Sequence, residues 1–120
     1  MLLSSFTMAE KGEKQYIIAL NTCPNAETAE KIAYSLVESQ LAACTNIIPT
    51  VQSIYRWQGK IEQEHEALLI IKTRKNKFTQ LESLIREHHP YELPEIVAVP
   101  IEAGTKEYLN WIDQSLEIKQ

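Results

Sequence analysis

The chain has 120 residues, of which 44% are apolar and 23% are charged, and its net charge is −4. This length fits one domain that buries about two-thirds of its unfolded surface. A negative chain is a poor candidate for binding nucleic acid, and its densest basic run, at residues 72–77, is short and typical of a solvated turn. Apolar runs such as residues 67–71 are far too short to span a membrane. The composition indicates a single soluble domain.

Residues 1–14 precede the first regular pattern and show no hydrophobic periodicity. They lack the charged start and the long apolar core of a signal peptide. We therefore expect a disordered N-terminal tail, followed by a single domain over residues 15–120. Translation could begin at Met1 or at Met8.

The chain has two cysteines, Cys23 and Cys44, and neither belongs to a CxxC motif. Two isolated thiols without a secretory signal favour a reduced, cytoplasmic protein. Cys44 follows two alanines at the start of an apolar segment, which is typical of a buried structural thiol.

The first third of the chain predicts a strand, a helix and a second strand. Residues 16–20 are β-prone and are followed by a polar turn. Asn25 is a candidate N-cap for a helix over about residues 26–41, whose apolar residues recur at helical spacing. Residues 43–48 form the second strand. Pro49 cannot donate a ladder hydrogen bond, so a bulge or a sheet edge is expected there.

Residues 51–57 alternate strictly, with Tyr55 and Trp57 on the same side of the strand. A tight turn at residues 58–59 follows, because glycine accepts a positive φ. The chain then returns over residues 60–71. This pattern predicts one long hairpin.

The remaining sequence predicts a helix over about residues 77–88, ended by Pro90, and a strand over residues 95–99. Thr105 is a candidate N-cap for a last helix. The apolar residues expected on the inner side of that helix are Tyr108, Leu109, Ile112 and Leu116.

This order is β-α-β-β-α-β with an extra C-terminal helix. It predicts an α+β fold of the ferredoxin-like kind, with an antiparallel sheet and a long central hairpin. Residues 17–20, 68–71 and 96–99 are apolar on both sides of their strands. Leaving the second face in water would forfeit about 10 kcal/mol. A second copy of the chain is the simplest cover, and the alternative is the C-terminal helix.

Residues 88–95 concentrate two imidazoles, a phenol and two carboxylates in a segment that also contains Pro90 and Pro94. Imidazole suits copper, zinc and nickel. Adjacent residues face different ways, so at most one of His88 and His89 is expected to serve a given ion. His88 lies on the apolar side of its helix and packing is its alternative role, so His89 is the better candidate. His65 is expected at the surface.

A second group of residues is compatible with a small-molecule pocket, because it combines aromatic rings with an acid and a base. The alternative is cross-strand packing with a satisfied ion pair. The candidate residues of this pocket, which is expected to lie between subunits, are Tyr55, Trp57, Glu64, Lys72, Tyr91 and Glu92. The sequence has no phosphate loop, nucleophile elbow or HExxH motif, so we expect no enzyme.

Several segments resemble the signature segments of the CutA family, in the right order and across about residues 16–116. They are LAACTNIIP at 41–49, SIYRWQGKIE at 53–62, LIIKT at 69–73, HPYELPE at 89–95 and YLNW at 108–111. The resemblance implies a ferredoxin-like homotrimer whose hairpins pair between subunits. It also implies a cytosolic protein of divalent-cation tolerance that binds copper.

In some bacterial members of that family, copper binding is ascribed to a Cys at the end of the first strand and to a His-His pair. His88 and His89 match the pair, but the Cys position holds Asn21, and Cys23 follows two residues later. The resemblance therefore implies weak binding of copper or another divalent cation by Cys23, His88 and His89. This binding needs neutral imidazole and weakens below about pH 6.

Two functions are compatible with these features. The first is a cytosolic homotrimer that binds metal ions such as copper and takes part in metal homeostasis. The alternative is a trimeric module, similar to the PII signalling proteins, that binds a small ligand or a protein at its subunit clefts.

Overall fold

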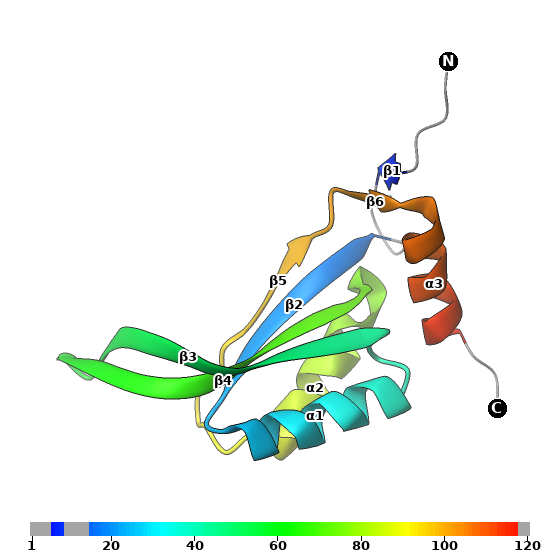
Figure 1. Cartoon of the computed structure of the whole chain (residues 1–120). Coiled ribbons are helices and arrows are strands. Elements are labelled where there is room, and N and C mark those ends of the chain that lie inside the picture. Colours follow the sequence, from blue (N-terminus) through cyan, green and yellow to red (C-terminus); the bar gives the residue numbers. More distant parts are fainter. Residues whose placement is uncertain (1–5, 9–14, 118–120) are drawn as a thin grey trace.

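The computed structural model describes residues 6–8 and 15–117. The chain has an α+β fold with a four-stranded antiparallel sheet in the order β3-β4-β2-β5 (Figure 1). The α+β class predicted from the sequence is confirmed. No helix in the described part of the chain is long and apolar enough to cross a membrane. The main elements are β2 (Tyr16–Cys23), α1 (Ala26–Glu38), β3 (Cys44–Trp57), β4 (Lys60–Arg74), α2 (Phe78–His88), β5 (Ile96–Pro100) and α3 (Lys106–Leu116).

Two further short strands lie outside this sheet. β1 (Phe6–Met8) pairs antiparallel with β6 (Ala103–Thr105), which precedes α3. Part of the predicted tail is thus paired with the chain, while residues 1–5 and 9–14 lie outside the described residues. Disorder in those two segments stays a prediction.

Helix α1 begins where the sequence predicted, because the Asn25 side chain accepts a hydrogen bond from the backbone N–H of Thr28. The predicted end at residue 41 is wrong, because α1 ends at Glu38. Gln40 has a φ of 60°, and the backbone N–H groups of Leu41 and Ala42 both donate to the carbonyl of Leu36. These bonds close the helix before the apolar pattern stops.

The long hairpin of β3 and β4 projects beyond the rest of the fold (Figure 1). Its register shifts between Ile48 and Val51, so the bulge predicted at Pro49 is confirmed. The turn at Gln58 and Gly59 takes positive φ values of 50° and 80°. The bulge separates the half of the hairpin that belongs to the sheet body from the half that projects.

Helices α1 and α2 cover one face of the sheet and enclose the main core. The fully buried aliphatic side chains of this core include Ile32, Leu36, Leu69, Ile71, Leu81 and Ile85. On β2, the residues that pack into this core are Ala19 and Cys23. Alternation along the strand therefore turns Ile18 and Leu20 to the opposite face.

Helix α3 covers only one end of that opposite face. Leu109, Ile112 and Leu116 are buried there with Tyr16, as predicted. The inward position predicted for Tyr108 is wrong, because its side chain is 42% exposed and its ring stacks 5.5 Å from that of Trp111.

The rest of this face has no cover within the described chain. The pairing of β2 with β4 and β5 places six aliphatic side chains on it, and Val97 and Val99 are each 48% exposed. We call this surface the uncovered sheet face, and it consists of Ile18, Leu20, Leu68, Ile70, Val97 and Val99.

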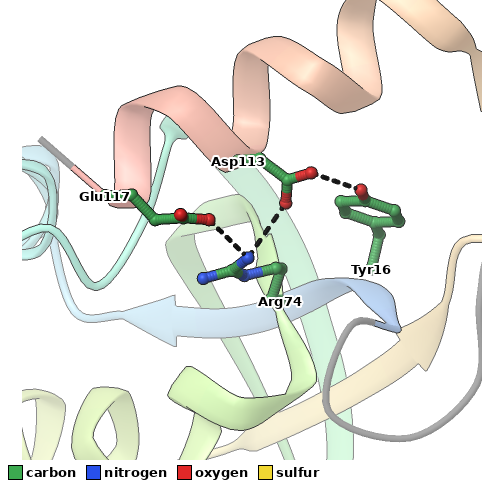
Figure 2. Close-up of polar contacts among 4 residues, drawn as sticks. All are labelled: Tyr16, Arg74, Asp113 and Glu117. Atoms are coloured by element: carbon green, nitrogen blue, oxygen red, sulfur yellow. Dashed lines mark hydrogen bonds and ion pairs between the residues drawn. The ribbon is translucent and has the colours of Figure 1, made fainter.

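A charge network around the buried Arg74 joins α3 to the sheet (Figure 2). The Arg74 side chain is only 10% exposed, and its Nη1 lies 3.1 Å from Asp113 Oδ1 and 2.8 Å from Glu117 Oε2. The hydroxyl of Tyr16 donates to Asp113 Oδ2 at 2.8 Å. Since a buried guanidinium is costly without carboxylate partners, Asp113 is the residue on which the position of α3 depends.

We expect Asp113→Ala to lower the free energy of unfolding by about 3 kcal/mol, because it leaves Arg74 buried with one carboxylate fewer. Tyr16→Phe removes a single hydrogen bond and should cost about 1 kcal/mol. Urea denaturation at one fixed protein concentration measures both values. A smaller effect for Asp113→Ala than for Tyr16→Phe would contradict the dependence of α3 on Asp113.

Candidate functional site

A cavity of about 600 Å³ lies at the base of the projecting half of the hairpin. Its walls come from β3 and β4 of the hairpin, from Thr22 at the end of β2, and from the segment between α2 and β5. On β4, Glu64 and Glu66 of the cavity and Leu68 of the uncovered sheet face occupy alternate positions, so their side chains point to the same side. The cavity therefore continues the same face of the sheet.

Two tyrosine hydroxyls in the cavity each donate to a glutamate. Tyr91 donates to Glu66 Oε2 at 2.9 Å, and Tyr55 donates to Glu64 Oε1. The hydrogen bond to Glu64 is the main reason why the pKa of Tyr55 rises to about 12. Burial, followed by the bond to Glu66, raises the pKa of Tyr91 above its ordinary value. Both phenols therefore stay protonated at neutral pH and act as donors.

Glu66 is the most buried carboxylate of the cavity, with only 7% of the residue exposed. Within residues 15–117 it forms no ion pair, and Tyr91 is its one hydrogen-bond donor. A buried carboxylate normally has a cationic partner or several donors. Glu66 thus adds an uncompensated negative charge to the cavity wall.

His89 holds in place the segment between α2 and β5, residues 89–95, which we call the wall segment. The residue is 8% exposed, its Nε2 lies 2.7 Å from the carbonyl oxygen of Thr22, and its Nδ1 lies 3.2 Å from the backbone nitrogen of Tyr91. A neutral ring that donates from Nε2 and accepts at Nδ1 satisfies both bonds. The amide of Asn21 donates to the carbonyl of Glu95 at 2.8 Å. The wall segment is thereby tied to β2 at both ends.

The structure brings together five of the six predicted pocket residues, which line this cavity: Tyr55, Trp57, Glu64, Tyr91 and Glu92. The sixth, Lys72, does not line this cavity within one chain. Lys72 lies eight positions after Glu64, which is about 26 Å along β4. Its ammonium donates to Asn46 Oδ1 and lies 4.0 Å from the sulfur of Cys44, which is only partly buried.

Sequence reasoning missed Glu66, which the structure places in the cavity wall. Its position two residues after Glu64 was the available signal, because alternate residues of a strand share a face. Its contact with Tyr91, 25 residues away, has no signal in the sequence pattern.

The three predicted metal ligands do not form a ligand set. Cys23 is fully buried, and its thiol donates to Asn21 Oδ1 at 3.2 Å. Burial, with a smaller effect of the Glu66 charge, raises the pKa of this thiol to about 11, whereas metal binding requires the thiolate. His89 uses both ring nitrogens in the bonds described above. His88 is exposed, and its Nδ1 lies 3.0 Å from the Leu84 carbonyl.

Among the residues that the structure describes, no three or more His, Cys, Asp or Glu side chains lie close enough to hold a metal ion. His65 is exposed, as expected. The residues present therefore do not fit a closed copper site built on Cys23, His88 and His89.

Residues 17–115 match the family described as "CutA1 divalent ion tolerance protein". The chain belongs to this family. The resemblance stated from the sequence is thus confirmed, and the family description names tolerance to divalent ions and no chemical reaction.

Relatives from distant organisms agree with this assignment. The chain is 47% identical over 98 residues to the divalent-cation tolerance protein CutA of Thermus thermophilus, a match that covers 82% of this chain and 95% of the relative. It is 46% identical over 99 residues to protein CutA of Mus musculus, and it spans only 56% of that protein's length. The mouse protein thus has regions with no counterpart in this match.

A solved structure shows the same architecture. This structure, of the periplasmic divalent cation tolerance protein CutA from Archaeoglobus fulgidus, superposes with a TM-score of 0.83 at 43% identity. The superposition covers 85% of this chain and 99% of that one. The α+β fold with its antiparallel sheet and three helices is therefore the fold of CutA1 structures.

We expect Cys23 to resist alkylation in the folded protein at pH 8, because it is fully buried and a pKa of about 11 leaves about one thiol in a thousand ionised. Mass spectrometry after iodoacetamide treatment, with and without urea, measures the modification at each cysteine. Rapid labelling of Cys23 without urea would show that the thiol is accessible as a ligand after all.

Proposed function

We propose that this protein takes part in divalent-cation homeostasis as a cytoplasmic homotrimer of ferredoxin-like subunits, and that it does not act as an enzyme. Membership of the CutA family supports the role in cation tolerance. The pairing of β2 with both β4 and β5 supports the ferredoxin-like description, because split βαβ folds place the first and last strands side by side. Two free cysteines support a reducing compartment.

The uncovered sheet face is the observation on which the homotrimer rests. Six aliphatic side chains at about 1.5–3 kcal/mol each represent about 10 kcal/mol if another subunit removes them from water. The sheet also ends in two edge strands, β3 and β5, each of which can pair with another chain. Pairing β3 of one subunit with β5 of the next is a head-to-tail contact, and such contacts form a ring when the rotation between subunits closes.

We expect light scattering at low micromolar concentration to give about three times the 13.8 kDa chain mass. Val99→Asp places a charge on the uncovered sheet face and should dissociate the assembly, because the charge would be buried at the interface. Tyr34→Asp is the matched control, since Tyr34 is 80% exposed on α1, which covers the other face. A folded monomer of the unaltered protein would contradict the proposal.

For metal, we propose weak binding of copper or another divalent cation through exposed imidazole rather than at a closed site. Of the three predicted ligands, His88 is the best-placed donor, because its ring is exposed and its contact with the Leu84 carbonyl engages only Nδ1. We expect His88→Ala to weaken copper binding more than His65→Ala, and acid to weaken it in the unaltered protein. Anaerobic calorimetry measures these affinities. Equal affinities in both variants would exclude His88 as a ligand.

The cavity supports a second candidate, a module similar to PII proteins that binds a small ligand at a subunit cleft. Its volume of about 600 Å³ is in the range of small-molecule sites, and it continues the face that we propose as the subunit interface. In this function, Glu66 and the residues around it are the binding site, and the neighbouring subunit closes the opening.

A further inference from the structure

We propose that the cavity binds an organic ammonium cation, with the carboxylate of Glu66 as its counter-ion and the rings of Tyr55, Trp57 and Tyr91 as its walls. This inference rests on the second candidate function and gives its ligand a chemical class. It is carried by the charge of the lining, the burial of Glu66 and the aromatic content of the walls.

The charge of the cavity favours a cation. Its lining contains one guanidinium, that of Arg56, and four carboxylates, those of Glu64, Glu66, Glu92 and Glu95. Carboxylates gathered around a concave space focus a negative potential that attracts cations. An anionic ligand is therefore disfavoured.

Glu66 is the proposed counter-ion of the bound cation, in addition to its share in the negative potential of the cavity. It is 7% exposed, and Tyr91 bonds its Oε2, while no described residue supplies a positive charge to it. Removing a carboxylate from water is costly unless a cation or several donors compensate it. A bound ammonium group would supply the cationic partner that Glu66 lacks within the described chain.

The aromatic walls distinguish an organic cation from a metal ion. Tyr55, Trp57 and Tyr91 border the same cavity as the carboxylates. Aromatic faces attract alkylammonium groups, whose charge is spread over apolar carbons, and quaternary ammonium ligands are recognised in this way. A hard metal ion instead needs converging oxygen ligands, and within residues 15–117 no three acidic or imidazole groups converge.

Choline and its neutral isostere 3,3-dimethylbutan-1-ol are the probes that separate charge recognition from apolar binding. We expect calorimetry on the full chain to show binding of choline and at least about tenfold weaker binding of the alcohol. Only the cation is attracted electrostatically by the carboxylates of the cavity. Equal binding of the two probes would overturn the proposal.

Glu66→Gln keeps the shape of the side chain and an oxygen that accepts from Tyr91, and it should weaken choline binding by about tenfold or more. Tyr55→Leu should weaken it by about fivefold through loss of one aromatic wall. Glu102→Gln, which makes the same charge change at an exposed residue outside the cavity, should leave binding unchanged. Wild-type affinity in Glu66→Gln would overturn the proposal.

Light scattering on the same samples separates this proposal from the proposed function. A trimer that binds no choline overturns the organic-cation site and leaves the homotrimer intact. Choline binding by a monomer supports the site and overturns the homotrimer. If copper chloride displaces choline from the unaltered protein but not from His88→Ala, the competition arises at His88 and the cavity assignment is overturned.

Discussion

The central strand β2 pairs with a strand on each side and carries apolar side chains on both faces, which must be removed from water. The rest of the fold is arranged around that constraint. β4 and β5 pair with its two sides. One set of alternate residues packs under α1 and α2, while Ile18 and Leu20 of the other set remain on the uncovered sheet face. The helices that one chain supplies cover one face and only an end of the second. The homotrimer that we propose would cover the rest of the second face, which is apolar because β2 is apolar on both sides.

Local signals in the sequence predicted the features that have local causes. Asn25 and Thr105 cap their helices because a side-chain oxygen meets an N–H three residues away. Pro49 distorts β3 because it lacks a donor. The end of α1 was missed because Leu41 and Ala42 stay apolar and buried after the helix has closed. The spacing of apolar residues indicates which side chains are buried, and here the chain stays buried after the last helical turn.

The candidate site could be predicted only in part, because its contacts join segments far apart in the sequence. The hairpin side of the cavity followed from alternation, which placed Tyr55 and Trp57 together. The bond between Tyr91 and Glu66 spans 25 residues and depends on how the segment before β5 folds back. Lys72 was grouped with Glu64 as a base and an acid beside aromatic rings, although residue types alone do not fix how far apart two side chains lie along β4.

His89 shows how a residue can match a family pattern and yet have another role. The sequence assigned it to metal, but both of its ring nitrogens are used to tie the wall segment to Thr22 and to fix the backbone of Tyr91. That backbone position sets the phenol against Glu66. A metal ion at His89 would have to displace one of these bonds and so release the wall. Metal binding at His89 and an intact cavity are therefore alternatives, which is why we propose an exposed imidazole for copper and the cavity for an organic ligand.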